Sequence, residues 1–269
     1  MTNENYDNLP ITASELEAEL CKVGIDKSKI KITVFDTVAS TNTVAKELAN
    51  TGVPTLVVAN GQTGGRGRLG RSFSCPDGAG IYMSLLFYPT VPVSEVSRLT
   101  CLAAVASLRA TYRVSGVRPF IKWVNDLYVG DKKLCGILTE GSANADGSLS
   151  YAVIGIGLNV HTADLGEYSG IATSIDAEGG RPTKRTELIA NILSELFPML
   201  EAEDSAPYFC EYIECAKPII GKSVTVIRGD ESYPATVVGI ESDGRLSVKR
   251  EDGKTVSLGS GEVSLSFKK

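Results

Sequence analysis

The sequence has little of what marks several large classes of protein. It holds one histidine, His161, and six cysteines that form no CxxC pair and no zinc-type spacing with it. A chain of 269 residues does not depend on disulfides, so we expect reduced, mostly buried thiols. No apolar run approaches the roughly 18 residues that span a membrane, and the polar start MTNENYDNLP lacks a signal-peptide core. These absences predict a cytoplasmic protein without membrane contact.

The chain also has fewer positive than negative side chains. The chain has 27 Lys and Arg against 32 Asp and Glu, a formal net charge of −5. A protein that depends on phosphate-backbone contacts is expected to carry the opposite sign. Hydrophobic content of 43% and charged content of 22% are typical of a globular protein with a packed core. The length fits one large domain, or one domain of about 200 residues with a small appendage.

Apolar periodicity predicts an α/β (α+β) protein with a mixed sheet flanked by helices. Strands are expected at 30–35, 56–59, 81–88, 120–124, 133–140 and 150–160, the last buried on both faces. Helices are expected at 13–23, 43–49, 94–113 with Ser94 as its cap, 186–202 interrupted at Pro198, and on to about 216. Five short β-rich runs over 222–267 predict a small barrel-like domain. We therefore expect domains at 1–216 and 217–269.

The most distinctive stretch is 64–71, which reads GGRGRLGR. Glycine lets the backbone approach a ligand closely, and arginine offers a planar charged fork to phosphate or carboxylate. The stretch nearly fits the P-loop pattern, but that pattern needs a helix directly afterwards. Here 74–80 is turn-like and a strand follows from Ile81, so we reject the P-loop. A solvated basic loop or an RG-type nucleic-acid tract is the alternative, and the single copy lacks neighbouring aromatics.

Two lysine-containing segments add polar groups at the ends of predicted strands. In 122–126, KWVND, a lysine can neutralise phosphate while Asn and Asp can bind Mg²⁺; a plain hairpin turn is the alternative. In 132–138, KKLCGIL, a lysine enters a strand that becomes apolar at once, or two lysines simply lie in a solvated turn. Gly136 inside that strand favours a ligand or another backbone approaching closely.

The strand at 153–160, VIGIGLNV, carries two glycines in a buried run. No third glycine or helix follows, so the match to a dinucleotide fingerprint is weak. Gly155 and Gly157 instead suggest room for a flat or bulky ligand, with Asn159 at the strand end. We assign His161 no catalytic role.

Taken together, these segments closely resemble the biotin–protein ligases, over about residues 30–265. The resemblance rests on STN at 40–42, GQTGGRGRLGR at 61–71, KWVNDL at 122–127, KLCGIL at 133–138 and GIGLN at 155–159. Val124 departs from the family's usual proline, and Phe73 stands where tryptophan is common.

The resemblance implies two half-reactions. The biotin carboxylate attacks the α-phosphate of ATP, and the ε-amine of an acceptor lysine then attacks the biotinyl-5′-AMP. The implied acceptor is a biotin carboxyl carrier protein domain, usually of acetyl-CoA carboxylase. Lys133 and Arg68 are the implied catalytic residues, and Asp126 and Asn159 the implied Mg²⁺ ligands. The implied substrate-binding residues are Ser40, Thr41, Asn42, Gln62, Gly65, Arg66, Gly67, Arg68, Arg71, Lys122, Asn125, Asp126, Lys133, Gly136, Gly155, Gly157 and Asn159.

The same resemblance implies a catalytic domain like the class II aminoacyl-tRNA synthetases, followed by an SH3-like barrel. About 30 residues precede the first expected strand, so we expect no DNA-binding domain and no nucleic-acid partner; a homodimer fits the family. We expect 64–71 to act as a lid that becomes ordered when ligands bind. A lipoate–protein ligase and a non-catalytic nucleotide-binding module remain as alternatives.

Overall fold

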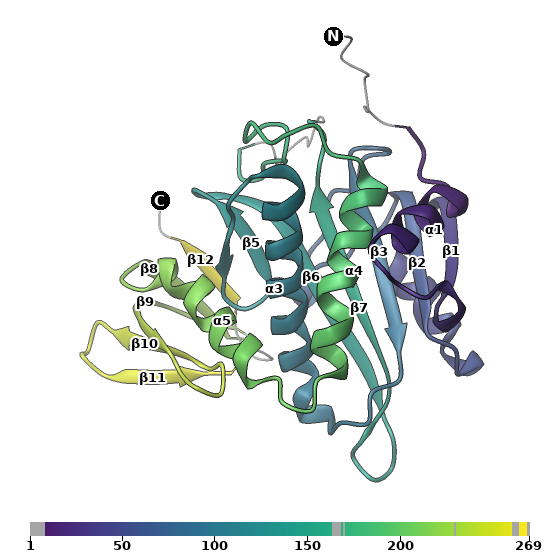
Figure 1. Cartoon of the computed structure of the whole chain (residues 1–269). Helices are drawn as coiled ribbons and strands as arrows, with labels where there is room; N and C mark the ends of the chain where they lie inside the picture. Colours follow the sequence, from purple (N-terminus) through teal and green to yellow (C-terminus); the bar gives the residue numbers. More distant parts are fainter. Residues whose placement is uncertain (1–8, 163–167, 169, 229, 260–263, 268–269) are drawn as a thin grey trace.

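A computed structural model describes residues 9–162, 168, 170–228, 230–259 and 264–267. Its larger sheet has seven strands in the order β1-β2-β3-β7-β6-β5-β4 (Figure 1). Only β1 and β2 pair in parallel within this sheet, and the other neighbours are antiparallel. The strands are β1 (Lys31–Val38), β2 (Thr55–Gln62), β3 (Gly80–Phe87), β4 (Phe120–Lys122), β5 (Asp126–Val129), β6 (Lys132–Ala143) and β7 (Leu149–Asn159). The predicted mixed sheet is confirmed.

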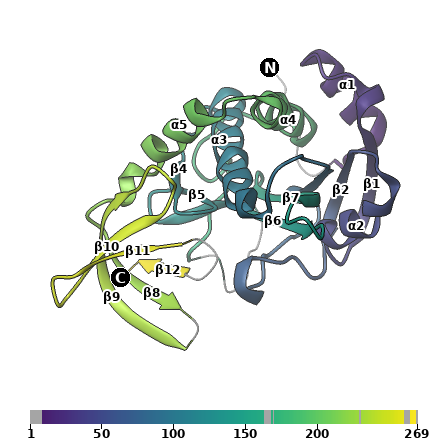
Figure 2. The same ribbon diagram turned by 90° about the horizontal axis from the view of Figure 1, so that it is seen from below.

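Helices cover the two faces of this sheet unequally. The longer helices α1, α3, α4 and α5 lie on one face, and the short α2 lies on the other (Figure 2). Their bounds are α1 (Ala13–Lys22), α2 (Thr41–Glu47), α3 (Val96–Ser115), α4 (Arg185–Glu201) and α5 (Ala206–Ala216). Short 3-10 turns occur at Lys27–Lys29, Ala49–Thr51, Arg68–Gly70, Val93–Glu95 and Lys217–Ile219. None of the described helices is both long and apolar enough to cross a bilayer.

Strand β7 lies at the centre of the sheet and has both faces covered, as predicted. Ile154, Ile156 and Leu158 join the main core with residues of α3 and α4. Val153 points to the other face, where it packs in a second apolar cluster with Ala45 of α2. Because side chains alternate along a strand, Gly155 and Gly157 share this second face. The two glycines therefore open space on the side that α2 covers only in part.

The N-terminal helix begins at residue 13, as expected, and is capped by Thr12. Thr12 accepts a hydrogen bond from the backbone N–H of Glu15 at 3.3 Å and donates its hydroxyl to the Glu15 carboxylate at 2.9 Å. Gly24 follows with φ of +79°, a left-handed conformation that glycine adopts without strain.

Several predicted element bounds were wrong. Ser94 lies in a 3-10 turn and α3 begins at Val96 without a side-chain cap. Helix α4 runs unbroken through Pro198 and ends at Glu201, so only the last turn of the helix follows the proline. The residues joining 120–124 to 133 are not a simple loop. They contain β5, which the pairing with β6 stabilises despite its four-residue length.

Two further expectations need correction. The strand expected at 30–35 continues as β1 to Val38, and the helix expected at 43–49 begins earlier, as α2 at Thr41. The six cysteines are free thiols, as predicted, but only Cys75, Cys101 and Cys135 are buried.

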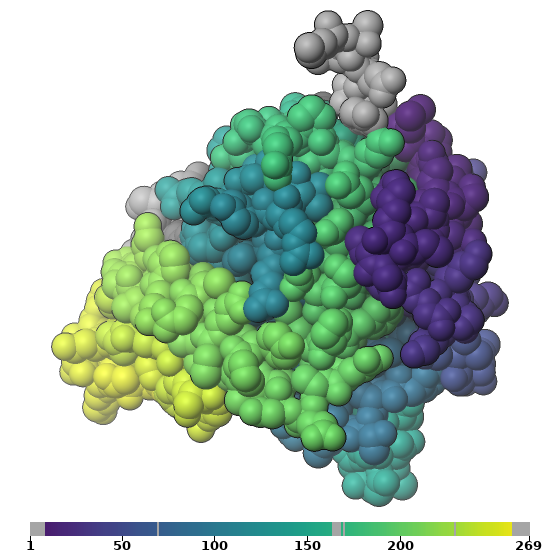
Figure 3. All heavy atoms as spheres, in the orientation of Figure 1, coloured from purple at the N-terminus to yellow at the C-terminus, as the bar shows by residue number. Residues whose placement is uncertain are grey.

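The C-terminal part forms a five-stranded antiparallel sheet in the order β11-β10-β9-β8-β12. Its strands are β8 (Ser223–Arg228), β9 (Glu231–Ile240), β10 (Leu246–Arg250), β11 (Thr255–Leu258) and β12 (Ser264–Phe267). Buried side chains from several strands give it an apolar interior: Val224, Val226, Val237, Leu246 and Val248. In Figure 3 its yellow atoms lie directly against the green atoms of α5.

Candidate functional site

Every residue predicted for the site except Gly65 lines one cavity of about 260 Å³. The cavity lies on the α2 side of the large sheet, above the glycines of β7. Gly65 lies just outside, where a Cβ atom would be 2.5 Å from the Phe73 carbonyl oxygen. Its lack of a side chain lets the two limbs of the loop approach each other. Residues that the sequence analysis did not select for the site also line the cavity: Ser72, Phe73, Ser74, Met83, Trp123, Tyr128, Ile137, Leu138, Ile156, Tyr168, Ile171 and Ala172.

The cavity is strongly basic within an acidic chain. Arg66, Arg68, Arg71, Lys122 and Lys133 line it, and Asp126 is the one acidic side chain among the described lining residues. Such an excess of positive charge in a chain of net charge −5 is local and directed at an anion.

The glycine–arginine loop is a hairpin tied at its base. The N–H of Gly64 donates to the carbonyl of Ala39 at 2.9 Å, which extends the pairing of β1 with β2. The N–H of Gly67 bonds the carbonyl of Arg71 at 2.7 Å, and Phe73 bonds Gly65 at 2.9 Å. No long helix follows, and the next regular element is β3. The structure therefore confirms that this is not a P-loop.

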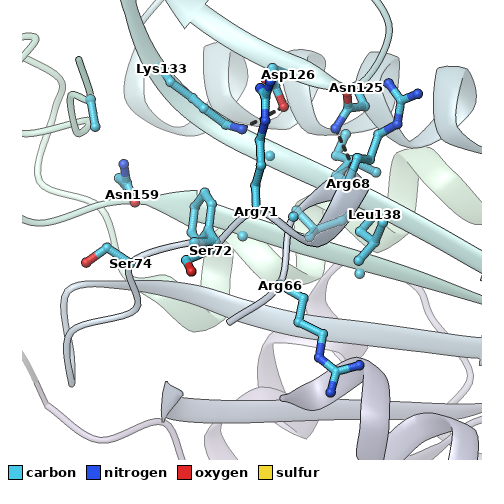
Figure 4. A pocket seen from close by; sticks show the side chains of 18 of the residues that line it. Arg66, Arg68, Arg71, Ser72, Ser74, Asn125, Asp126, Lys133, Leu138 and Asn159 are labelled. Carbon is cyan, nitrogen blue, oxygen red and sulfur yellow. Dashed lines mark hydrogen bonds and ion pairs between the residues drawn. The ribbon is translucent and has the colours of Figure 1, made fainter. Parts of the chain in front are cut away.

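The three arginines of the loop point in different directions (Figure 4). Arg68 donates from Nη1 to Oδ1 of Asn125 at 3.3 Å, and Arg71 extends toward Lys133 and Asp126. Arg66 is directed away from this group (Figure 4). Burial lowers the pKa of Arg68, and the nearby Asp126 carboxylate opposes that shift. Arg68 and Arg71 are thus the loop cations that face the cluster on β5 and β6.

Lys133 and Asp126 form an ion pair at 2.8 Å across the β5–β6 pair. Oδ1 of Asp126 is buried, and its contact with Lys133 does not have the geometry of a hydrogen bond. The interaction between the two side chains is therefore an electrostatic one between opposite charges. The backbone of Lys133 is fixed from the other side: its N–H donates to Ile171 and its carbonyl accepts from Thr173, each at 2.9 Å. This 171–173 segment was missed by the sequence analysis, because nothing in its local pattern shows that it pairs with β6.

Two more polar side chains complete this end of the cavity. Lys122 is 9% exposed, and its Nζ donates to the Tyr128 hydroxyl at 3.2 Å. Burial lowers the pKa of Lys122, against the opposing effect of Asp126. Asn159 donates from Nδ2 to the carbonyl of Thr173 at 2.8 Å. Lys122 and Asn159 are therefore held in place by the protein.

The Phe73 ring covers two glycines that line the cavity, Gly136 and Gly157. A Cβ on Gly157 would lie 2.7 Å from Cε1 of Phe73, and one on Gly136 would lie 3.3 Å from Cε2. Lys133 also lies over Gly136, with Nζ 5.7 Å from the centre of the Phe73 ring. The Phe73 ring thus fills the space that these two glycines open.

Gly155 makes room for a different side chain, that of Asn42. A Cβ there would lie 2.1 Å from Oδ1 of Asn42. That oxygen accepts from the Ser84 hydroxyl at 2.6 Å, and the Asn42 amide donates to Glu140 at 2.8 Å. Desolvation alone would raise the pKa of Glu140, but hydrogen bonds from Lys46 and Asn42 outweigh it and the pKa falls below its ordinary value. Gly155 leaves room for this buried polar network.

The opposite end of the cavity presents neutral hydrogen-bonding groups. Oε1 of Gln62 accepts from the Thr41 N–H at 2.7 Å and from the Thr41 hydroxyl at 3.2 Å. The amide nitrogen of Gln62 contacts Sγ of Cys75 at 2.9 Å. Burial raises the pKa of the Cys75 thiol to about 12, so it stays neutral. The cavity therefore has a cationic end and a neutral polar end.

Metal-binding capacity at the site is modest. In the described part of the chain, no three His, Cys, Asp or Glu side chains gather into a possible metal site. Asp126 and Asn159 offer oxygen atoms at the cationic end, which suits Mg²⁺ held mainly by substrate phosphates and water. His161 is buried and pairs through Nδ1 with Asp176 at 3.1 Å, outside the cavity lining.

Comparison with known proteins agrees with this geometry. Residues 34–159 match the biotin/lipoate A/B protein ligase family, and residues 219–266 match the biotin protein ligase C-terminal domain. The biotin–[acetyl-CoA-carboxylase] ligase of Paracoccus denitrificans is 31% identical over 233 residues, which cover 81% of this chain and 93% of that one. The chain belongs to the biotin protein ligase family.

Other relatives share part of their length or the fold. The bifunctional ligase/repressor BirA of Bacillus spizizenii is 42% identical over 163 residues, and the chain spans about half of that relative's length. The structure of the Aquifex aeolicus biotin protein ligase in complex with biotin and ATP superimposes with a TM-score of 0.70 at 24% identity. That match covers 88% of this chain and 99% of the other, so the two share one fold.

Proposed function

We propose that the protein is an ATP-dependent biotin–protein ligase. It forms biotinyl-5′-AMP and transfers biotin to a lysine of a biotin carboxyl carrier protein domain. The observation that carries this proposal is the cavity lined by five basic side chains, four of which (Arg68, Arg71, Lys122 and Lys133) gather at one end, with neutral polar groups at the other (Figure 4). In a member of this family, such a cavity fits a triphosphate beside an uncharged ureido ring.

In the first half-reaction, a carboxylate oxygen of biotin attacks the α-phosphorus of ATP and pyrophosphate leaves. Two anions must meet, and preorganised cations lower that barrier most. Lys133 stabilises the charge between carboxylate and α-phosphate, while Arg68 and Arg71 close over both. Lys122, Asn125 and the carbonyl-bound Asn159 hold the phosphates.

In the second half-reaction, the ε-amine of the acceptor lysine attacks the carbonyl carbon of the mixed anhydride. An amide bond forms, AMP leaves and the amine loses a proton. Because the loop carries Arg68 and Arg71 on a hairpin, it acts as a lid that keeps the adenylate until the acceptor arrives.

The neutral end of the cavity takes biotin. Ser40, Thr41 and Gln62 supply hydrogen-bonding groups there, with Asn42 held behind them by Ser84 and Glu140. Asp126 and Asn159 would hold the Mg²⁺ that accompanies ATP, at the cationic end of the cavity. The metal supplies charge neutralisation on the phosphates.

The proposed setting follows from the same identification. The acceptor is a carrier domain of acetyl-CoA carboxylase or a related carboxylase, and the enzyme works in the cytoplasm, with a homodimer as its assembly. Nucleic acid is not among the proposed partners, since a net charge of −5 disfavours backbone binding. A biotin-dependent, sequence-specific shift of DNA by this chain would contradict that part of the proposal.

Pyrophosphate exchange into ATP, with biotin or lipoate supplied separately, tests the activity. We expect exchange with biotin and transfer of biotin to a carrier domain, lost when the acceptor lysine is replaced by arginine. Exchange with lipoate alone would identify a lipoate–protein ligase. Exchange with neither acid, together with measurable ATP binding, would identify a non-catalytic nucleotide-binding module.

A further inference from the structure

The single tryptophan of the chain joins the two domains. The indole N–H of Trp123 donates to the carbonyl of Gly244 at 2.9 Å, and Trp123 is 4% exposed. Gly244 lies in the turn between β9 and β10, on the C-terminal domain. Trp123 directly follows β4, two residues before Asn125. A partly buried hydrogen bond therefore connects the C-terminal domain to the corner at Trp123 and Val124, which leads into β5.

Position 244 strongly favours glycine in this arrangement. Its φ is +82°, a conformation that strains other residues, and a Cβ would lie 2.6 Å from Cζ of Phe209. The β9–β10 turn is thus packed tightly between Trp123 and the ring of Phe209 on α5.

A second hydrogen bond fixes the next residue of the same corner. Phe209 stacks on Tyr212 with ring centres 5.9 Å apart. The hydroxyl of Tyr212, fully buried, donates to the carbonyl of Val124 at 3.0 Å. Trp123 and Val124 are consecutive, and the peptide bond between them is cis. Both are held by groups that lie outside the large sheet.

The residues that follow carry the proposed phosphate contacts. Asn125 accepts from Arg68 at 3.3 Å, and Asp126 pairs with Lys133 at 2.8 Å. A movement of the corner at Trp123 and Val124 passes to Asn125 and Asp126 through the backbone, against the two hydrogen bonds, at 2.8 and 2.9 Å, that join Asn125 to Ile137 of β6. The biotin end of the cavity lies on β2 and α2 and has no such connection.

We propose that the β9–β10 turn is a positioning element for the ATP end of the site, acting through the Gly244–Trp123 hydrogen bond. Gly244 and Trp123 are its positioning residues. The turn sets where Asn125 and Asp126 stand, so the C-terminal domain contributes to adenylate formation as well as to the surface around the site. This inference rests on the proposed function for the identity of the nucleotide.

The matched variants are Gly244→Ala and Gly253→Ala. Gly253 lies in the next turn of the same domain with φ of +84°, and nothing lies within 4 Å of its Cβ position. Both substitutions impose the same backbone strain, but only Gly244→Ala pushes against Phe209. Since Trp123 is the only tryptophan, its fluorescence reports the corner in both variants without requiring activity.

We expect Gly244→Ala to shift the tryptophan emission and to raise the Kd and KM for ATP about tenfold, the effect of roughly one misplaced charge-assisted contact. The KM for biotin stays within about twofold because Thr41 and Gln62 are unaffected. Gly253→Ala matches the wild type in emission and in both constants. If the two glycines had only a structural role, both variants would be less stable, and the ratio of the KM for ATP to the KM for biotin would be that of the wild type.

Trp123→Phe keeps an aromatic ring and removes the N–H, so it tests the same bond should Gly244→Ala fail to fold. We expect a rise of about fivefold in the Kd for ATP, measured by calorimetry. Unchanged ATP affinity in Trp123→Phe, or equal behaviour of the two alanine variants, overturns the inference. Failure of the proposed function looks different: the wild type itself then gives no exchange with biotin.

Discussion

The ammonium nitrogen of Lys133 lies 2.8 Å from Oδ1 of Asp126, so the proposed catalytic lysine is paired with the proposed Mg²⁺ ligand. The two residues stand on adjacent antiparallel strands, and both side chains are largely buried. In the proposed function, Lys133 would exchange this partner for phosphate, and Asp126 would become available to hold Mg²⁺. The pair holds both side chains near their working positions beforehand.

We predict that Lys133→Ala abolishes adenylate formation while the fold remains intact. Removing a preorganised cation of this kind raises the activation free energy by on the order of 3 kcal/mol, which slows the reaction at least about 100-fold. Biotin-dependent pyrophosphate exchange measures the loss, and far-ultraviolet circular dichroism checks the fold. Lys132→Ala is the matched control, since Lys132 is exposed beside it. Near-normal exchange in Lys133→Ala would remove this lysine from the mechanism.

For Arg68→Gly we predict a leaky site. Arg68 contacts Asn125 from the lid, so its loss weakens closure and biotinyl-5′-AMP escapes faster. A single-turnover assay that separates free from retained adenylate measures this escape. Arg66 is directed away from Asn125 and Asp126, and Arg66→Gly should retain the adenylate better than Arg68→Gly (Figure 4). Equal retention by wild type and Arg68→Gly would refute the role of Arg68 in the lid.

Gly157→Ala should be destabilising through one identifiable contact. The new methyl meets the Phe73 ring at 2.7 Å, and overpacking of this kind costs about 1–3 kcal/mol. Chemical denaturation measures the free energy of unfolding, and Phe73→Ala in the same chain should recover part of the loss. Gly239→Ala, on β9 with nothing near its Cβ position, is the control. Additive effects of the two substitutions would show that the ring and the glycine are independent.

Stability should depend on pH through Glu140. Its pKa is lower in the folded protein than its ordinary value of 4.5, so the unfolded chain binds more protons in this range. The stabilisation is therefore complete above about pH 4.5 and is lost as pH falls through the folded-state pKa. Glu140→Gln should show a smaller loss of stability between pH 6 and pH 3, measured by urea unfolding. Lys46→Met removes the partner at 2.8 Å and should reduce the same acid dependence.

The sequence predicted the large elements well because their signals are local. The apolar run of β7 can be recognised without knowledge of the rest of the chain. Strand β5 was missed because four residues beginning with Asp126 carry no such signal, and pairing with β6 creates the strand. Ser94 was predicted to be a helix cap from its residue type alone, but it lies in a 3-10 turn that precedes the helix.

The site was predicted as a set of residues but not as an arrangement. Motifs in order along the chain indicated which side chains converge, and all but Gly65 line one cavity. Nothing in the sequence indicated that the Phe73 ring covers Gly157 or that Ile171 bonds the backbone of Lys133. Such contacts depend on how distant segments pack, so only coordinates reveal them. The roles assigned to the individual residues stay predictions until the variants are measured.

The basic cavity within an acidic chain also affects how substrates arrive. At physiological ionic strength the Debye length is about 8 Å, so an approaching polyanion feels the cavity's cations only at close range. Farther out, the net charge of −5 repels it. Lower salt extends the reach of both fields, and their effects on the association rate oppose each other. Nucleotide capture by this protein should therefore vary less with salt than capture by a protein whose whole surface is basic.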